Sequence, residues 1–511
     1  MKKIIKSRKL GITISYANTI VNMVTGLVLS SFLLRSLGDT EYGLYQTVAS
    51  FSTYLVLLEF GTGTVMTRNI SVCLNQTEPD KREEAVNRNY STVWIISLAL
   101  SAIILLVAFI FYINLGNIYS NTMTPEQVAY GQKILLFLFG YLIFSYLSQN
   151  VRGMLLAYEE YVFFNALSLI KMILRFAFLI LFISIFQRSI IIAMVDLFLA
   201  LCLFLIAFIY GKRKYHVKIS PRYFDKTVFI TSIPMCIALL LQTLTNQANS
   251  NVDKFVIGVM MSVESVALYS VVQYIFTMFS SIATIPVSMF LPEVSRNMAK
   301  KLPPREFTDT LINPCRLTVI ICGSILCGFF AVGRQFIEIM YGADKKSAWI
   351  YVLVILVPMF LNMTNAVIIN VLDIANKRLV RSLALLGTTI ANIILTVWFI
   401  SMWGIVGAVI ATAITLLIGN VLVMNIYYKK KFGIMVLYLF KEAYKGILPF
   451  QIIAGIAAFF VARLIPNVLL SMLTGGVVFL AISAALIILF GLNESEKSKL
   501  KKLTRRFRKK G

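Results

Sequence analysis

The amino-acid sequence predicts an all-α polytopic membrane protein that crosses the bilayer about fourteen times. Two observations support this class. Apolar segments of about 20 residues or more recur from end to end. In addition, 59% of the 511 residues are hydrophobic and only 14% are charged, whereas a soluble domain usually carries about 25% charged residues. With a mean hydropathy of +0.82, the chain has too little polar surface to cover a water-soluble fold of this size.

The expected spans follow from the apolar runs, each long enough to cross a hydrocarbon core of about 30 Å as a helix. The first run comes after the basic residues 1–9 and continues to about Leu37 without a small-residue cleavage pattern, so we expect an uncleaved first helix. The expected spans are residues 11–36, 42–67, 90–114, 132–155, 161–186, 189–210, 227–249, 264–290, 313–333, 349–371, 380–401, 403–426, 446–464 and 467–490.

Lysine and arginine predict the orientation, because cytoplasmic loops retain positive charge. With both termini in the cytoplasm, most of the 48 basic residues fall in the tails and cytoplasmic loops. We therefore expect a multi-pass protein of the cytoplasmic membrane. The net charge of +25 is explained by the basic residues of the cytoplasmic loops and tails, which are expected to contact anionic lipid headgroups. It does not indicate a nucleic-acid partner. The basic tail, residues 497–510, is expected to lie on the inner leaflet.

Short segments recur at a spacing of about 220 residues, as in transporters built from two related bundles. Residues 41–45 and 265–269 open the second and eighth spans, and residues 155–159 and 373–377 close the fourth and tenth. Because six spans separate the copies, both halves share one orientation. The sequence thus predicts three parts, namely an N-terminal six-helix lobe at 1–215, a C-terminal six-helix lobe at 216–432, and two additional transmembrane helices with a basic cytoplasmic tail at 433–511.

Short motifs are spread over nearly the whole chain, at residues 37–45 (LGDTEYGLY), 58–63 with Arg68, 253–258 (DKFVIG), 340–342 and 404–408. Together they resemble the polysaccharide transport flippases, a branch of the multidrug, oligosaccharidyl-lipid and polysaccharide exporter superfamily. The resemblance implies two six-helix lobes around a central cavity that move lipid-linked oligosaccharide to the outer leaflet by alternating access. It also implies glycan polymerase and glycosyltransferase partners. The chain differs from the family at Glu59, where Asp is common.

Two basic residues within the fifth span are candidates for binding an anionic headgroup. Lys171 and Arg175 stand four residues apart near the middle of this span, so they share one helix face. A central Lys or Arg costs about 2.5–3.5 kcal/mol on insertion scales, and like charges at this spacing repel by a few tenths more. The pattern therefore predicts a wet, anion-facing surface. The structural alternative for Arg175 is a salt bridge with Asp196.

Polar residues at the first and seventh spans form a second candidate group. Arg35 and Lys254 are expected to face each other near one mouth of the cavity and to hold a pyrophosphate, although ordinary helix-end solvation also explains them. The amides expected to line the cavity and to hydrogen-bond sugar hydroxyls are Asn18, Asn22, Gln242, Asn246, Asn249 and Asn251.

The remaining candidates are residues for the initial capture of substrate and for binding a coupling ion. Arg68 and Arg152 are expected at cytoplasmic helix ends, where they would make the first contact with substrate, although positive-inside placement alone also accounts for them. Glu59, Asp196 and Asp253 are candidates for binding a coupling ion. The sequence leaves sodium, protons and membrane potential all open as the driving force.

No enzyme site is visible, and we expect neither a cofactor nor a metal. The chain contains no GxxxxGK[ST] loop, and its six cysteines form no CxxC pair. The favoured function is a flippase for polyprenyl-diphosphate-linked oligosaccharide. One alternative is a cation-coupled multidrug exporter, which should favour buried carboxylates. Others are a membrane polysaccharide polymerase or ligase, which needs a large outer loop, and an envelope scaffold, which would not need Lys171 and Arg175.

Overall fold

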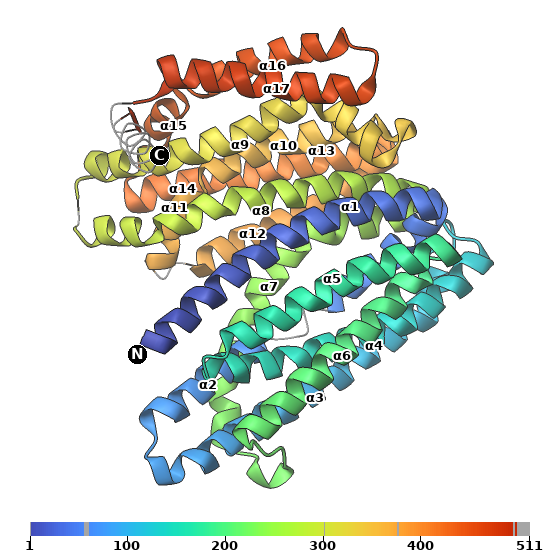
Figure 1. Ribbon diagram of the computed structural model, residues 1–511, viewed down its shortest axis with the longest axis vertical. Coiled ribbons are helices and arrows are strands. Elements are labelled where there is room, and N and C mark those ends of the chain that lie inside the picture. The colour runs from blue at the N-terminus through green and yellow to red at the C-terminus, as the bar shows by residue number, and fades with distance from the viewer. Residues whose placement is uncertain (1, 56–60, 301, 376–377, 494–495, 498–511) are drawn as a thin grey trace. The chain divides into compact units, whose positions relative to one another are not determined.

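The computed structural model describes residues 2–55, 61–300, 302–375, 378–493 and 496–497 (Figure 1). Side chains within some of these ranges, including 2–20 and 241–251, are outside the description. About 90% of the chain is helical, and no strand occurs in the ranges given. The all-α prediction is therefore confirmed.

The helices follow one another with short connections. They are α1 (Lys2–Leu55), α2 (Thr62–Gln76), α3 (Pro79–Ile118), α4 (Pro125–Ala157), α5 (Tyr161–Phe186), α6 (Ile190–Tyr215), η2 (Pro221–Tyr223), α7 (Lys226–Met260), α8 (Val263–Ala299), α9 (Pro304–Tyr341), η3 (Ala343–Lys345), α10 (Ala348–Thr364), α11 (Ala366–Ile374), α12 (Arg378–Trp403), α13 (Ile405–Thr415), η4 (Leu416–Val423), α14 (Met424–Phe432), α15 (Val436–Tyr444), α16 (Leu448–Arg463), α17 (Val468–Leu486) and η5 (Ile487–Gly491).

Within the part of the chain that is described, 10 helices are long and apolar enough to cross a membrane. The number rises to 11 if the bent pair α15 and α16 forms one span. Two shorter apolar helical segments, Lys226–Ile237 and Ala348–Thr364, come in addition. The multi-pass architecture is thus confirmed, while the expected count of about fourteen spans is not. One reason is that the expected second span, 42–67, is divided between the end of α1 and α2.

Helix α1 consists of two helices that meet at Gly38, where φ is 75° and ψ is 174°. This φ lies in a region that costs glycine little and strains other residues. The break therefore falls between the first two expected spans. Beyond it, Glu41 accepts hydrogen bonds from the backbone nitrogen of Ser189 at 3.0 Å and its hydroxyl at 2.6 Å. The LGDTEYGLY motif thus fixes the start of α6 to α1.

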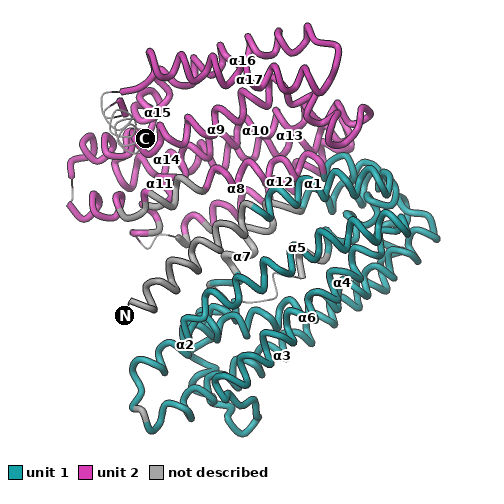
Figure 2. The backbone as a smooth tube through the Cα atoms, viewed as in Figure 1, with its two compact units in different colours: residues 1–270 teal, residues 271–511 magenta. Residues whose placement is uncertain are grey.

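The chain divides into two compact units, residues 1–270 and 271–511 (Figure 2). In the first unit, α4 packs against α2 and α6, while α1 packs against α5 and α7. In the second unit, α9 packs against α10, α15, α16 and α17. The expected lobe boundaries at 215 and 432 stay a prediction.

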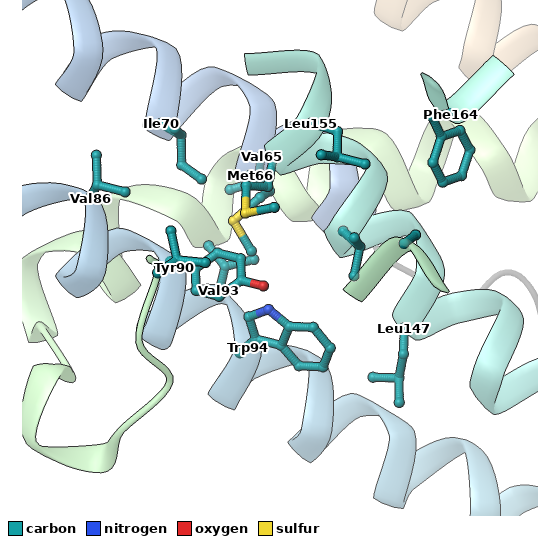
Figure 3. Packing of buried hydrophobic residues seen from close by; sticks show 14 of the residues in the cluster. Val65, Met66, Ile70, Val86, Tyr90, Val93, Trp94, Leu147, Leu155 and Phe164 are labelled. Atoms are coloured by element: carbon teal, nitrogen blue, oxygen red, sulfur yellow. The ribbon is translucent and has the colours of Figure 1, made fainter. Parts of the chain in front are cut away.

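A buried cluster in the first unit joins α2, α3 and α4 and includes a few residues of α5, α6 and α7 (Figure 3). Its labelled members are Val65, Met66, Ile70, Val86, Tyr90, Val93, Trp94, Leu147, Leu155 and Phe164. In α2 the buried positions Met66 and Ile70 are one turn apart, so they share a face, while Thr64 and Arg68 are exposed on another. This amphipathic pattern fixes α2 in place and turns its polar face away from the core.

Helices α2 and α4 approach each other unusually closely. A Cβ atom added to Gly153 would overlap the backbone carbonyl oxygen of Gly63, and one added to Gly63 would lie 2.6 Å from the carbonyl oxygen of Gln149. The hydroxyl of Thr67 also donates to the carbonyl oxygen of Gly153 at 3.0 Å. Two glycines therefore set the distance between these helices.

The close contact between α2 and α4 predicts that a methyl group added at Gly153 lowers stability. We expect Gly153→Ala to lower the free energy of unfolding by about 1–3 kcal/mol, because the added Cβ meets backbone atoms that cannot rotate away. Gly387→Ala in α12, where a Cβ meets nothing within 4 Å, is the matched control. Thermal unfolding in detergent compares the two variants, and equal melting temperatures would contradict the close contact.

A buried arginine organises the second unit. Arg316 of α9 is only 4% exposed. Its guanidinium donates to both carboxylate oxygens of Glu496, at 3.0 and 3.1 Å. It also donates to the carbonyl oxygens of Glu442 at 3.1 Å, Lys445 at 2.9 Å and Gly491 at 2.6 Å. Arg316 therefore ties α9 to the ends of α15 and η5, a contact that the sequence analysis did not identify.

Candidate functional site

A cavity of about 480 Å³ lies between α1, α4 and α5 in the first unit, and we call it the Lys171 cavity. Its polar lining residues are Asn22, Thr25, Tyr141, Ser168, Lys171 and Arg175. Ser168, Lys171 and Arg175 line it together because their spacings of three and four residues place them on one face of α5. The structure thus brings Asn22 of the predicted amide set beside the two predicted cations.

Lys171 has an aromatic neighbour and makes no direct ion pair with the described residues. Its ammonium nitrogen lies 5.5 Å from the ring centroid of Tyr141. Over the ranges that the structure covers, no carboxylate lies within 4.0 Å of it. A cation–π contact contributes about 0.5–2 kcal/mol, which is less than the cost of about 2.5–3.5 kcal/mol for a lysine at the centre of a span. The cation–π contact alone therefore does not offset the cost of placing Lys171 at this depth.

Arg175 forms the ion pair that was the structural alternative. Its Nε donates to Asp196 Oδ1 at 2.5 Å and its Nη2 donates to Asp196 Oδ2 at 3.0 Å. The side chain of Arg175 is 35% exposed and that of Asp196 is 9% exposed. Arg175 thus lines the cavity without adding net charge, and both oxygens of Asp196 have a cationic partner. The role of Asp196 in ion coupling stays a prediction.

The two-bond geometry of this pair predicts strong coupling between its members. We expect Asp196→Asn to destabilise the protein by about 1–3 kcal/mol, because it leaves a partly buried guanidinium without its counter-charge. The double variant Arg175→Met/Asp196→Leu should recover most of this loss. A double-mutant cycle of thermal unfolding measures the coupling, and additive single effects would show that the two residues do not interact.

The predicted group around Arg35 and Lys254 is only partly brought together. Lys254 donates to Gln46 Oε1 on α1 at 3.4 Å. Asp253 is buried and accepts a hydrogen bond from the Tyr269 hydroxyl at 2.6 Å. Arg35 is exposed on α1 just before the break at Gly38. The facing arrangement of Arg35 and Lys254, and ion binding by Asp253, stay predictions.

Several predicted residues lie outside what the structure describes. Glu59 belongs to the undescribed residues 56–60. The side chains of five predicted cavity-lining amides are also not described, namely those of Asn18, Gln242, Asn246, Asn249 and Asn251.

A second cavity, of about 560 Å³, lies between α2 and α4. We call it the arginine cavity, because Arg68 of α2 and Arg152 of α4 both line it. Its other polar lining residues are Thr62, Thr64, Thr67, Ser71 and Gln149. Arg68 and Arg152 lie far apart in the sequence, and the structure places them in one cavity.

Some lining residues were missed, although spacing identifies a few of them. Thr25 follows Asn22 by three residues and Ser168 precedes Lys171 by three, so each shares a helix face with a predicted residue. Tyr141 belongs to α4, a different helix from Lys171. Only the packing of α4 on its neighbours reveals this contact.

The fold and its cavities define an all-helical, multi-pass membrane protein with polar side chains inside its first unit. The chain is similar to the structure described as "Lipid II flippase MurJ, inward closed conformation", with a TM-score of 0.71 and 16% identity over 94% of this chain and 98% of that chain. It is also similar to an inward-facing multidrug resistance MATE family transporter of the MOP superfamily, with a TM-score of 0.58 and 15% identity over 81% of this chain and 96% of that chain.

Residues 9–298 match the family described as "Polysaccharide biosynthesis protein", and the chain belongs to this family. The family resemblance inferred from the short motifs is therefore confirmed. A search of curated proteins found no match.

Proposed function

We propose that the protein is a flippase that moves polyprenyl-diphosphate-linked oligosaccharide from the inner to the outer leaflet by alternating access. The observation that carries the proposal is the Lys171 cavity, where a lysine near the middle of α5 meets polar side chains and no carboxylate in the described ranges. A cation in this setting is suited to bind an anion that must cross the bilayer core.

The lining of the Lys171 cavity fits a sugar diphosphate. Phosphate oxygens accept charge-assisted hydrogen bonds, which are about twice as strong as neutral ones. Lys171 supplies the charge, and the Arg175–Asp196 pair keeps a guanidinium at the wall without adding to it. Asn22, Thr25 and Ser168 offer amide and hydroxyl groups to further oxygens.

The family and the fold support the same substrate class. The family is described by polysaccharide biosynthesis, and the structural neighbour with a TM-score of 0.71 is described as a flippase of lipid II. Transport of a lipid-linked glycan precursor across the membrane is consistent with both the family and this structural neighbour. By analogy, the lipid tail stays in hydrocarbon while the headgroup passes through a polar cavity.

The alternatives fit less well. An exporter of organic cations would need a net negative cavity, whereas the Lys171 cavity carries a net positive charge. A polymerase or ligase would need an outer loop large enough to bear catalytic groups. The connections expected to face outward are short, at residues 119–124, 187–189, 261–262, 342–347, 404 and 464–467.

The setting of the protein is part of the proposal. Both termini lie in the cytoplasm, and the basic residues 497–510 contact anionic headgroups of the inner leaflet. No cofactor takes part, and a sodium, proton or electrical gradient drives the cycle. Glycosyltransferases supply the substrate at the inner leaflet, and a glycan polymerase receives it at the outer leaflet.

Reconstitution tests the function directly. The purified protein is placed in liposomes with labelled polyprenyl-diphosphate oligosaccharide, and exposure of the label in each leaflet is followed with and without an ion gradient. We expect protein-dependent exchange of the oligosaccharide lipid and no transport of a lipophilic organic cation. Transport of the cation alone would overturn the proposal in favour of multidrug export.

A further inference from the structure

We infer that the arginine cavity is a binding site for the phosphate groups of a lipid headgroup, and that it loads the diphosphate of the carried lipid before that lipid reaches Lys171. The anion chemistry follows from the cavity itself. The identity of the lipid rests on the proposed function.

The two arginines form no ion pair with a carboxylate of the described residues. Arg68 Nη1 lies 3.3 Å from the sulfur of Met235. Arg152 Nη1 lies 3.5 Å from Gln149 Oε1, and its Cζ lies 5.7 Å from the ring centroid of Phe164. In the part of the molecule that the structure covers, neither guanidinium has a carboxylate within 4.0 Å. Two cations therefore share one cavity with weak neutral partners.

Two acidic residues on adjoining elements, Glu160 and Asp225, are engaged elsewhere. Glu160, in the connection after α4, accepts hydrogen bonds from Lys214 and from the Tyr215 hydroxyl, the latter at 2.9 Å. Burial opposes ionisation of Glu160, but these hydrogen bonds outweigh it and hold the pKa of its carboxyl below the ordinary value. Asp225 accepts from the backbone nitrogen of Thr227 at 2.8 Å at the start of α7. The charge of the arginine cavity thus stays uncompensated by these groups.

The cavity is held by a rigid frame. The apolar face of α2 is packed into the buried cluster of Figure 3, and the Gly63–Gly153 contact locks α2 against α4. The first turn of α2 also lines the cavity, and its N-cap residue Gly61 provides no side-chain hydrogen bond. The partial positive charge of a helix N-terminus adds to that of the two arginines. This frame fixes the backbone positions from which Arg68 and Arg152 reach the cavity, which reduces the entropy lost when they bind an anion.

Size and position also fit a loading site. A volume of about 560 Å³ lies within the range of about 300–1,000 Å³ found for small-molecule sites. Arg152 lies close to the end of α4, which is expected to face the cytoplasm. Tyr141, the neighbour of Lys171, lies about three turns earlier on nearly the same face of α4. Tyr141, which lines the Lys171 cavity, and Arg152, which lines the arginine cavity, are therefore about 16 Å apart along the axis of α4.

Binding and transport measurements on the full-length protein test the inference. The probes are polyprenyl diphosphate, inorganic diphosphate and phosphatidylglycerol, titrated against the parent, Arg68→Gln/Arg152→Gln, Arg68→Lys/Arg152→Lys and the control Arg222→Gln in the exposed η2. We expect the double glutamine variant to weaken polyprenyl diphosphate binding at least about 30-fold, because two charged hydrogen-bond donors are lost. The lysine variant should keep much of the binding, and Arg222→Gln all of it.

The dependence of the transport rate on lipid concentration distinguishes loading of the lipid from its translocation. The double glutamine variant should raise the half-saturating lipid concentration by the same factor and leave the plateau rate within about twofold, whereas Lys171→Gln should lower the plateau. Inorganic diphosphate should bind more weakly than the lipid, with the same dependence on both arginines.

Two results would decide against the inference or one of its parts, and a third would decide against the proposed function alone. A folded double glutamine variant that binds and transports like the parent overturns it, while leaving the role of Lys171 intact. Equal binding of phosphatidylglycerol overturns the assignment to the carried lipid. If the parent fails to transport oligosaccharide lipid but still binds diphosphate through Arg68 and Arg152, the proposed function fails and the anion site stands.

Discussion

Lys171→Gln is expected to lower transport of lipid-linked oligosaccharide by about 100-fold, while leaving the amount of folded protein unchanged. The substitution removes the net positive charge of the Lys171 cavity, since Arg175 is neutralised by Asp196. A hydrogen bond to a charged group contributes about 1.5–3 kcal/mol, and about 1.4 kcal/mol corresponds to a factor of ten. The initial transport rate in proteoliposomes measures the loss.

Two further variants test whether the effect depends on the positive charge and on its position at residue 171. Lys171→Arg keeps the charge and should retain most activity. Lys133→Gln removes an equally positive side chain from an exposed site on α4 outside both cavities, and it should transport normally. Full activity of a folded Lys171→Gln protein would show that the headgroup does not need this charge.

Arg316→Met is expected to have the largest effect on stability. Removal of Arg316 leaves the buried part of Glu496 and three carbonyl oxygens without their donor. Breaking a buried ion pair from one side costs about 3–5 kcal/mol. For a unit of this size the melting temperature should fall by about 10 °C. Thermal unfolding in detergent measures the change.

The same helix offers a matched control. Arg334 also lies on α9 but is exposed, so Arg334→Met should change the melting temperature by no more than a degree or two. The melting temperature of Glu496→Gln should lie between those of Arg316→Met and Arg334→Met, because the substitution removes one charge and keeps the side-chain shape. A melting temperature of Arg316→Met equal to that of Arg334→Met would contradict the clamp.

The sequence carries the fold class because hydrophobic length is a local property. The apolar runs predicted a multi-pass helical protein, and the break at Gly38 lies where the first two expected spans meet. The span count is not confirmed, since a run such as 42–67 contains both the end of α1 and the start of α2. Length and hydropathy do not show where a helix ends within an apolar run.

The candidate site was predictable only as far as helix faces allow. Lys171 and Arg175 were found because uncompensated charge in an apolar helix is conspicuous, and the pairing of Arg175 with Asp196 was foreseen as an alternative. The neighbour Tyr141 and the shared cavity of Arg68 and Arg152 depend on how α4 packs against α2 and α5. Contacts between helices of this kind have no signature in the spacing of residues along one helix.

Arg316 shows the same limit for stability. In the sequence it is one more basic residue near a helix expected to start in the cytoplasm, where positive-inside placement explains it. Its partners, Glu496 and the carbonyl oxygens of Glu442 and Gly491, come more than a hundred residues later. Only the folded second unit shows that this arginine is buried and shared between three segments.

Restoring the charge at residue 171 by chemistry tests the central claim most directly. Lys171→Cys, reconstituted with labelled oligosaccharide lipid, is treated with an aminoethyl or a sulfonatoethyl thiosulfonate reagent, and the parent protein is treated alongside because it has six cysteines of its own. We predict that the positive aminoethyl group restores transport to at least a tenth of the parent rate and that the negative group does not. Equal rates with both reagents would contradict the account.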